Sequence, residues 1–263
     1  MTITATDEKK DFSSESGHWY DRDGKPRYTI IGKNGKERAT TLRDARTEGL
    51  VPSVSTILRM EAAPALERWK IQQSCLACVT LPRIAEESDD AFMARALKDS
   101  QEQARKAAER GTYLHGLLED TVRNSRLPFK ASHADAAIIQ PVIDWLAANF
   151  TGYNWFAERS FATDRYGGKI DLHGAADNDS VVIDYKFKDG VESGKRLAYD
   201  NHSTQLAAYA NGLGTPSCRC INLFIDSVKP GVVVPHEWSP GEVLNGYKAF
   251  ELLLSLWYLS KGL

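Results

Sequence analysis

The sequence contains no hydrophobic run long enough to cross a lipid bilayer. The longest candidate, Leu252 to Leu259, is interrupted by Ser255 and is much shorter than the roughly 20 apolar residues that a membrane span requires. Cysteine is also scarce, because the 263 residues include only four. We therefore expect neither a membrane span nor a disulfide framework.

A surplus of charge of either sign is absent as well. The 33 basic and 35 acidic residues leave a formal net charge of −2, so the chain as a whole has no positive field that would attract a polyanion. Any nucleic-acid site must therefore be local. The hydrophobic share of 42% is ordinary, and the length allows one large domain or two small ones, each with a sizeable core.

The first 16 residues lack both the apolar segment of a secretory signal and the acid-poor composition of a transit peptide. We expect a frayed tail and a cytoplasmic protein whose cysteines are reduced. Residues 1–50 are predicted to form this tail and a basic β-hairpin module at 22–46. The module is either an arm that guides a nucleic-acid strand or a solvated ribbon, and its stacking platforms as an arm would be Trp19, Tyr20 and Tyr28.

Hydrophobic periodicity and turn residues predict the elements that follow. An extended Val51-Pro52 step comes before a short helix capped by Ser53 or Ser55. Gly111 is predicted to break one helix, and Thr112 to cap the next. The other predicted elements are helices at 64–79, 89–110, 135–150 and 203–212, strands at 155–163, 169–175, 180–187, 221–228 and 232–234, turns at 167–168 and 177–178, and a last helix after a capping box at 239–242.

Two aspartates are predicted to face each other in the three-stranded meander. A turn centred between residues 177 and 178 places Asp171 opposite Asp184, with Cβ atoms roughly 5 Å apart. Two ionised carboxylates repel each other at that distance unless a cation lies between them. The two-residue period of a strand adds Lys186 and Lys169 to the same face. The alternative is a solvated hairpin in which these Asp and Lys side chains simply pair.

Two pairs of residues on predicted helices flank this face. His115 and Glu119 are spaced i, i+4 at the edge of an apolar stripe, where a cleft would open. Gln205 and Tyr209 repeat the spacing on the helix after the meander and offer donors for a phosphate or a water. Each pair alone would be unremarkable in a globular protein.

The order helix, three strands, helix, strand resembles the PD-(D/E)XK nuclease superfamily, and within it the RecB-type branch. The resemblance rests on Arg110-Gly111-Thr112 with His115, on Gly168-Lys169-Ile170-Asp171, on Asp184-Tyr185-Lys186, and on the Gln205 and Tyr209 pair. Upstream, Val51-Pro52-Ser53-Val54 and Glu67-Arg68-Trp69-Lys70 are similar to the mitochondrial genome maintenance exonuclease and related phage exonucleases.

This resemblance implies an α/β (α+β) fold with a restriction-endonuclease-like αβββαβ core, a central mixed sheet and flanking helices. The core would occupy about residues 110–228 of a nuclease domain at 51–263 that carries a helical insert. An N-terminal hairpin and helical extension and a C-terminal helix would complete the chain.

The implied activity is that of a metal-dependent DNA exonuclease acting on single-stranded ends in recombination, repair or replication, in a bacterial or phage-infected cell. Mg²⁺ or Mn²⁺ would be held by His115, Asp171, Asp184 and the Tyr185 carbonyl. Lys186 would help to activate the attacking water, and Glu119 would reach a second metal through water. Contacts with DNA are assigned to Arg110, Thr112, Lys169, Gln205 and Tyr209. A single-strand-binding or recombination partner is left open.

Two alternatives use the same residues: a structure-selective endonuclease, and a nucleic-acid-binding module without turnover. Some RecB-type nucleases also carry an iron–sulfur cluster, but their cysteines follow a one-plus-three spacing, whereas this chain has two pairs. We therefore predict no cluster and four small buried residues, namely Cys75, Cys78, Cys218 and Cys220.

Overall fold

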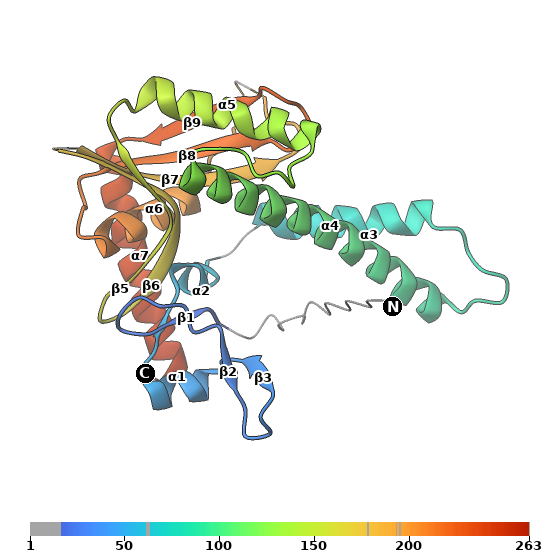
Figure 1. The fold of residues 1–263 in the computed structure, drawn as a ribbon. Coiled ribbons are helices and arrows are strands. Elements are labelled where there is room, and N and C mark those ends of the chain that lie inside the picture. Colours follow the sequence, from blue (N-terminus) through green and yellow to red (C-terminus); the bar gives the residue numbers. More distant parts are fainter. Residues whose placement is uncertain (1–16, 62–63, 178, 193, 195, 263) are drawn as a thin grey trace, which may run out of the picture.

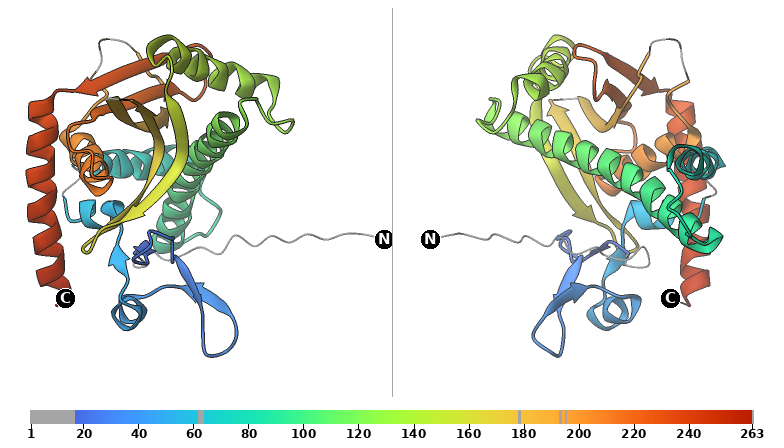
Figure 2. Two further views of the ribbon diagram at one scale, coloured as in Figure 1. Left: turned by 60° about the vertical axis from the view of Figure 1, so that its left-hand side comes forward. Right: turned by 90° about the vertical axis from the view of Figure 1, so that its right-hand side faces the viewer.

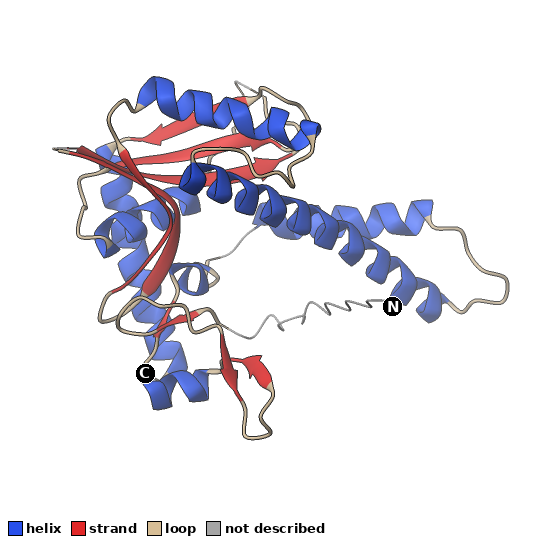
Figure 3. Cartoon of the chain, viewed as in Figure 1, coloured by secondary structure: helices blue, strands red, loops and turns tan. Residues whose placement is uncertain are grey.

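A computed structural model describes residues 17–61, 64–177, 179–192, 194 and 196–262. The expected tail at 1–16 and Asn178 of the expected turn lie outside the described residues. A five-stranded mixed sheet stands at the centre, and helices flank it (Figures 1 and 3). The predicted α/β class is therefore confirmed. None of the described helices combines the length and apolar character that a bilayer crossing demands.

The central sheet has the order β5-β6-β7-β8-β9. The first three strands form the predicted antiparallel meander, β7 and β8 are parallel, and β9 returns antiparallel to β8. Helix α6 makes the crossover that a parallel pair requires. The bounds are β5 Asn154–Ala162, β6 Gly167–Ala176, β7 Asp179–Lys188, α6 Asp200–Gly212, β8 Arg219–Asp226 and β9 Val233–Trp238.

Both faces of the sheet are covered by helices (Figure 2). On one face α4 (Asp89–Asn124) and α5 (His133–Asn149) bury Leu114, Ile139 and Ile183 in one apolar cluster. On the other face α6 and α7 (Pro240–Lys261) bury Leu206 and Phe250 in a second one. The alternation predicted for β7 is correct, because its odd-numbered residues from 181 to 185 belong to the first cluster.

The N-terminal region packs against this core. Strand β1 (Trp19–Tyr20) pairs with β4 (Val51–Pro52), and α2 (Val54–Leu58) is capped by Ser53 as predicted. Trp19 and Tyr20 are each only 2% exposed, and the Trp19 ring contacts Trp257. Of the two alternatives for the module, the arm would have used these two rings as stacking platforms. The core buries both of them, so neither ring is available for stacking.

The basic module also differs from its prediction. Strands β2 (Thr29–Ile31) and β3 (Glu37–Ala39) form the hairpin, but residues from 42 onward form helix α1 (Leu42–Glu48). Thr41 and Asp44 build a capping box that starts this helix. Asp44 also accepts two hydrogen bonds from Arg38, at 2.6 and 2.8 Å, and Arg27 pairs with Glu48. Part of the module's positive charge is thus already neutralised within the fold.

Helix α4 is one unbroken helix of 36 residues. The predicted break at Gly111 and the predicted cap at Thr112 are wrong, because both lie inside it. One internal glycine costs only about 1 kcal/mol, and the buried Leu114, Leu117 and Leu118 anchor the helix to the sheet just beyond it. Helix α3 (Pro64–Thr80) packs along the first part of α4, and the two project together from the sheet (Figure 1).

Gly167 and Gly168 lie inside strand β6 rather than in the turn before it. The turn is formed by residues 163–166. A Cβ on Gly167 would come within 2.8 Å of Tyr20, and one on Gly168 within 2.9 Å of Tyr209. These glycines therefore allow other elements to approach the strand closely. The dipeptide Gly-Gly is compatible with this role as well as with a turn, and the sequence alone does not distinguish the two.

The cysteines divide into two kinds. Cys218 and Cys220 are buried as predicted, whereas Cys75 and Cys78 are exposed on α3. The prediction that all four are buried is therefore wrong for Cys75 and Cys78. These two stay exposed because α3 contacts the rest of the protein mainly through α4.

Candidate active site

The predicted register of the two aspartates agrees with the pairing of β6 and β7. Leu172 pairs with Ile183 and His173 with Val182, so the next step in this register places Asp171 opposite Asp184. No backbone pair of β6 and β7 is formed at that step. Instead the backbone N–H of Tyr185 donates to the Asp171 carboxylate at 2.8 Å.

Asp184 is held by two side chains, those of Lys186 and Asn222. Its side chain is only 4% exposed. The Lys186 ammonium lies 2.7 Å from Oδ2 and 3.0 Å from Oδ1, while the Asn222 amide donates to Oδ2 at 2.8 Å. Burial lowers the pKa of Lys186, but the charges of Asp184 and Asp171 outweigh it and raise that pKa. The ammonium therefore stays charged beside the carboxylates.

The negative charge of Asp171 is less well balanced by its neighbours than that of Asp184. Burial and the nearby charge of Asp184 raise the pKa of Asp171 above its usual value, while His115 and Lys186 act in the opposite direction. The His115 Nδ1 atom lies 3.6 Å from Asp171 Oδ2. The repulsion predicted for two facing acids is thus present in the structure.

Helix α4 brings His115 and Glu119 to this carboxylate. Both line a small pocket together with Asp171, Tyr185 and Glu158. The His115 ring makes an edge contact with Phe187, with centroids 5.2 Å apart. Glu119 forms an ion pair with Arg123 at 2.8 Å.

Glu158 is a pocket residue that the sequence analysis missed. It lies on β5 between the pairs of Ala157 with Leu172 and Arg159 with Ile170, so its register position is opposite Asp171. Its φ of +53° is uncommon for a residue other than glycine. Its carboxylate forms an ion pair with Lys169. The only signal that could have found it is the pairing of β5 with β6, which the alternation of a single strand does not reveal.

Gln205 and Tyr209 extend the site along α6. The Lys186 ammonium donates to Gln205 Oε1 at 3.3 Å, and Gln205 Nε2 donates to the Tyr209 hydroxyl at 3.1 Å. Tyr209 is only 6% exposed, and burial raises its pKa, so the phenol is neutral. The predicted i, i+4 pair is therefore linked directly to the lysine.

The remaining predicted DNA contacts have other partners in the structure. Arg110 forms an ion pair with Asp135 at 2.6 Å, which joins α4 to α5. Lys169 pairs with Glu158. Thr112 is exposed on α4. Contacts from these three residues to DNA stay predictions.

In the part of the chain that the structure describes, no three His, Cys, Asp or Glu side chains are preassembled as a metal site. The donor chemistry nevertheless fits one divalent cation. Two carboxylates and an imidazole are ligands that Mg²⁺ and Mn²⁺ accept, and the repulsion between Asp171 and Asp184 is what such a cation would relieve. In this structure the positive charge beside Asp184 comes from Lys186.

No known protein-family model and no curated protein sequence matches the chain. Among solved structures, the crystal structure of SSO0001 is similar at 14% identity and a TM-score of 0.31, over 72% of this chain and 86% of that one. An alkaline exonuclease from Laribacter hongkongensis is similar at 13% identity and a TM-score of 0.30, over 74% of this chain and 97% of that one. Likenesses this distant assign neither a fold family nor an activity, so a function must be inferred from the residues of the site.

Proposed function

We propose that the protein is a metal-dependent DNA exonuclease that hydrolyses phosphodiester bonds at single-stranded ends. The observation that supports this most is the convergence of Asp171, Asp184 and Lys186 at the point where β6 and β7 stop pairing, with His115 3.6 Å from the first carboxylate. Two acids and an imidazole can hold a divalent cation, and an ammonium can stabilise charge on a phosphate, so this set can support metal-assisted attack of water.

The ion would be held by His115, Asp171, Asp184 and the Tyr185 carbonyl. Glu119 lines the same pocket as His115 and Asp171 and would bind a second ion through water. A bound Mg²⁺ or Mn²⁺ would polarise the phosphoryl oxygen and lower the pKa of a water.

Lys186 is oriented for the reaction by its neighbours. Asp184 and Gln205 both accept from its ammonium, at 2.7 and 3.3 Å, so the charge is fixed before a substrate arrives. From this position it would stabilise negative charge on the phosphate and orient the attacking water. Gln205 and Tyr209 would contact the DNA backbone beside it, which allows binding without sequence preference.

The decisive experiment compares end-labelled linear single-stranded DNA with a covalently closed single-stranded circle, each with and without Mg²⁺. We expect mononucleotides or short oligomers from the linear DNA in Mg²⁺, and no cleavage of the circle. Cleavage of the circle would favour a structure-selective endonuclease. Binding of both DNAs with no cleavage in Mg²⁺ or Mn²⁺ would favour a binding module and contradict the proposal.

A further inference from the structure

Asn222 is a fully buried polar residue on β8. In the parallel ladder of β7 and β8 it stands directly beside Asp184. An amide at such a position is costly to bury unless its donors and acceptor have partners. The partners of Asn222 therefore indicate why it is there.

Both ends of the Asn222 amide are engaged. Trp238 Nε1 donates to Asn222 Oδ1 at 2.7 Å, and Asn222 Nδ2 donates to Asp184 Oδ2 at 2.8 Å. An indole nitrogen can only donate a hydrogen bond. The Trp238 contact therefore fixes which end of the amide is the oxygen, and the NH₂ group must point at the carboxylate.

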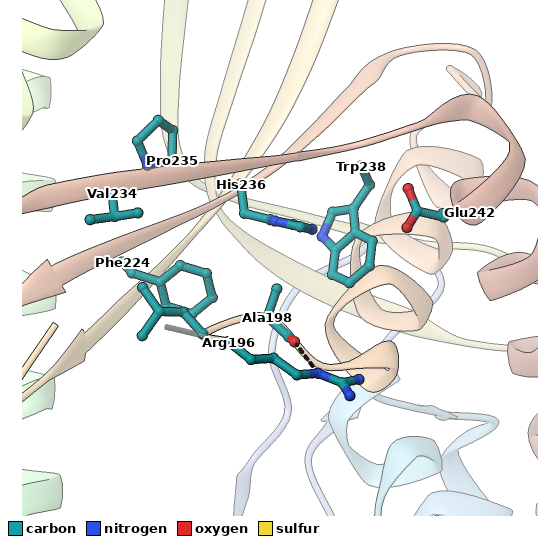
Figure 4. Close-up of a pocket in the computed structure, with 9 residues that line it drawn as sticks. Arg196, Ala198, Phe224, Val234, Pro235, His236, Trp238 and Glu242 are labelled. Carbon is teal, nitrogen blue, oxygen red and sulfur yellow. Dashed lines mark hydrogen bonds between the residues drawn. The ribbon is translucent and has the colours of Figure 1, made fainter. Parts of the chain in front are cut away.

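Trp238 is itself held in place on the edge strand β9. It is 7% exposed, and its ring packs against His236 with centroids 4.4 Å apart. The two rings lie side by side in the wall of a pocket of about 290 Å³ (Figure 4). The indole that orients the amide is thus part of a packed aromatic group rather than a free side chain.

We propose that Asn222 is a positioning residue for Asp184 and that Trp238 sets its orientation. This inference rests on the proposed function, in which Asp184 is a metal ligand. The amide donates to Oδ2, so it holds the carboxylate in the site when a cation displaces Lys186 from it or when a phosphate draws the ammonium away. Partners that fix a ligand in this way commonly change metal affinity by about 10- to 100-fold when they are lost.

The test is a titration of the full-length chain with Mn²⁺ alone, without DNA, followed by electron paramagnetic resonance of the free ion. Asn222→Leu keeps the branched shape of the side chain, although it is bulkier, and removes the amide. We expect its Mn²⁺ affinity to fall by about 10-fold or more. Cys220→Ala is the matched control, because Cys220 is also fully buried on β8 but stands beside Val182 rather than beside Asp184. We expect it to bind Mn²⁺ like the wild type even though it loses stability.

Trp238→Phe keeps the inference testable if Asn222→Leu does not fold. This variant leaves the hydrogen bond between Asn222 and Asp184 possible but frees the amide to turn, so we expect a smaller loss of Mn²⁺ affinity. Wild-type affinity in Asn222→Leu, or in Trp238→Phe when only the latter folds, would overturn the positioning role while leaving the nuclease proposal intact. A wild-type chain that binds no Mn²⁺ would overturn both.

Discussion

Tyr185 and Asp171 are joined across the end of the β6 and β7 ladder, where the backbone N–H of Tyr185 donates to the carboxylate at 2.8 Å. The side chain of Asp171 thus takes the place of a backbone acceptor. One fifth of that side chain remains exposed. The two strands stop pairing at the aspartates, and part of the Asp171 carboxylate is open to solvent.

Lys186→Ala should abolish cleavage. The ammonium is the charged donor nearest Asp184, and loss of one preorganised donor typically lowers kcat by about 100- to 1,000-fold. DNA binding should change only a few-fold, because other phosphate contacts remain. A single-turnover cleavage assay and a binding titration on the same end-labelled DNA would measure both.

Lys188→Ala is the control for that variant. Lys188 lies on the same strand, and its ammonium donates to the Leu197 carbonyl at 3.3 Å rather than to either aspartate. It should cleave at close to the wild-type rate. Retained turnover in Lys186→Ala would remove the proposed role of the lysine.

Asp171→Asn should abolish cleavage and make the metal-free protein more stable. An asparagine oxygen can still accept from Tyr185, while the repulsion from Asp184 that raises the pKa of Asp171 disappears. We expect a gain of about 1 kcal/mol, or roughly 2 to 4 °C in Tm for a chain of this size. Thermal unfolding followed by circular dichroism in chelator would measure it.

Added Mn²⁺ should stabilise the wild type more than Asp171→Asn, which is the reverse of the order expected without metal. Mn²⁺ should raise the Tm of the wild type, because a ligand that binds only the folded state stabilises it, and should leave that of Asp171→Asn nearly unchanged. Equal Tm shifts for the two proteins would place the ion elsewhere.

Gln205→Ala should weaken cleavage by about 10-fold, less than Lys186→Ala. Gln205 orients the ammonium at 3.3 Å but carries no charge, and a neutral hydrogen bond contributes only about 0.5 to 1.5 kcal/mol. Asn211→Ala, on the same helix, removes a hydrogen bond to the Ala207 carbonyl instead and should leave the rate unchanged. A rate for Gln205→Ala as low as that of Lys186→Ala would show that the glutamine has a direct part in the chemistry.

Asp226→Asn should destabilise the fold without involving the site. The carboxylate is fully buried and accepts backbone N–H groups of Val191, Val228 and Lys229 at 2.8 to 3.0 Å. Burial raises the pKa of Asp226, but these donors outweigh it and lower that pKa. We expect a loss of about 1 to 3 kcal/mol in the free energy of unfolding, measured in urea at pH 7.

The pH dependence follows from the direction of that shift. A carboxyl whose pKa is lower in the folded state contributes stability above the unfolded pKa of about 3.9, and the contribution is lost as pH falls through the folded value. The difference between the wild type and Asp226→Asn should therefore shrink in strong acid. If the difference in the free energy of unfolding stayed constant down to strong acid, the ionic role of Asp226 would be contradicted. Asp23→Asn, at an exposed position, is the control and should unfold like the wild type both at pH 7 and in strong acid.

Local patterns were enough to predict the class of the fold and the two aspartates. The register of Asp171 with Asp184 depends only on where a short turn is centred, and a turn is specified by a few adjacent residues. The caps at Ser53 and Ser239 are local in the same way. Predictions of this kind need no knowledge of distant contacts.

Features that depend on distant packing were not predicted. Gly111 continues a helix because of leucines beyond it, and Gly167 lies in a strand because Tyr20 packs against it. Trp19 is buried by a helix at the other end of the sequence. Glu158 and Asn222 enter the site through strand pairings that no single segment encodes.

The unbroken α4 has a mechanical consequence. At 1.5 Å per residue its 36 residues span about 54 Å, and His115 lies near the sheet end of this length. A stiff rod of this kind transmits a tilt of its far tip to the imidazole instead of absorbing it at a hinge. Because no break separates the projection from the site, one continuous helix sets the direction of the projection and the position of His115.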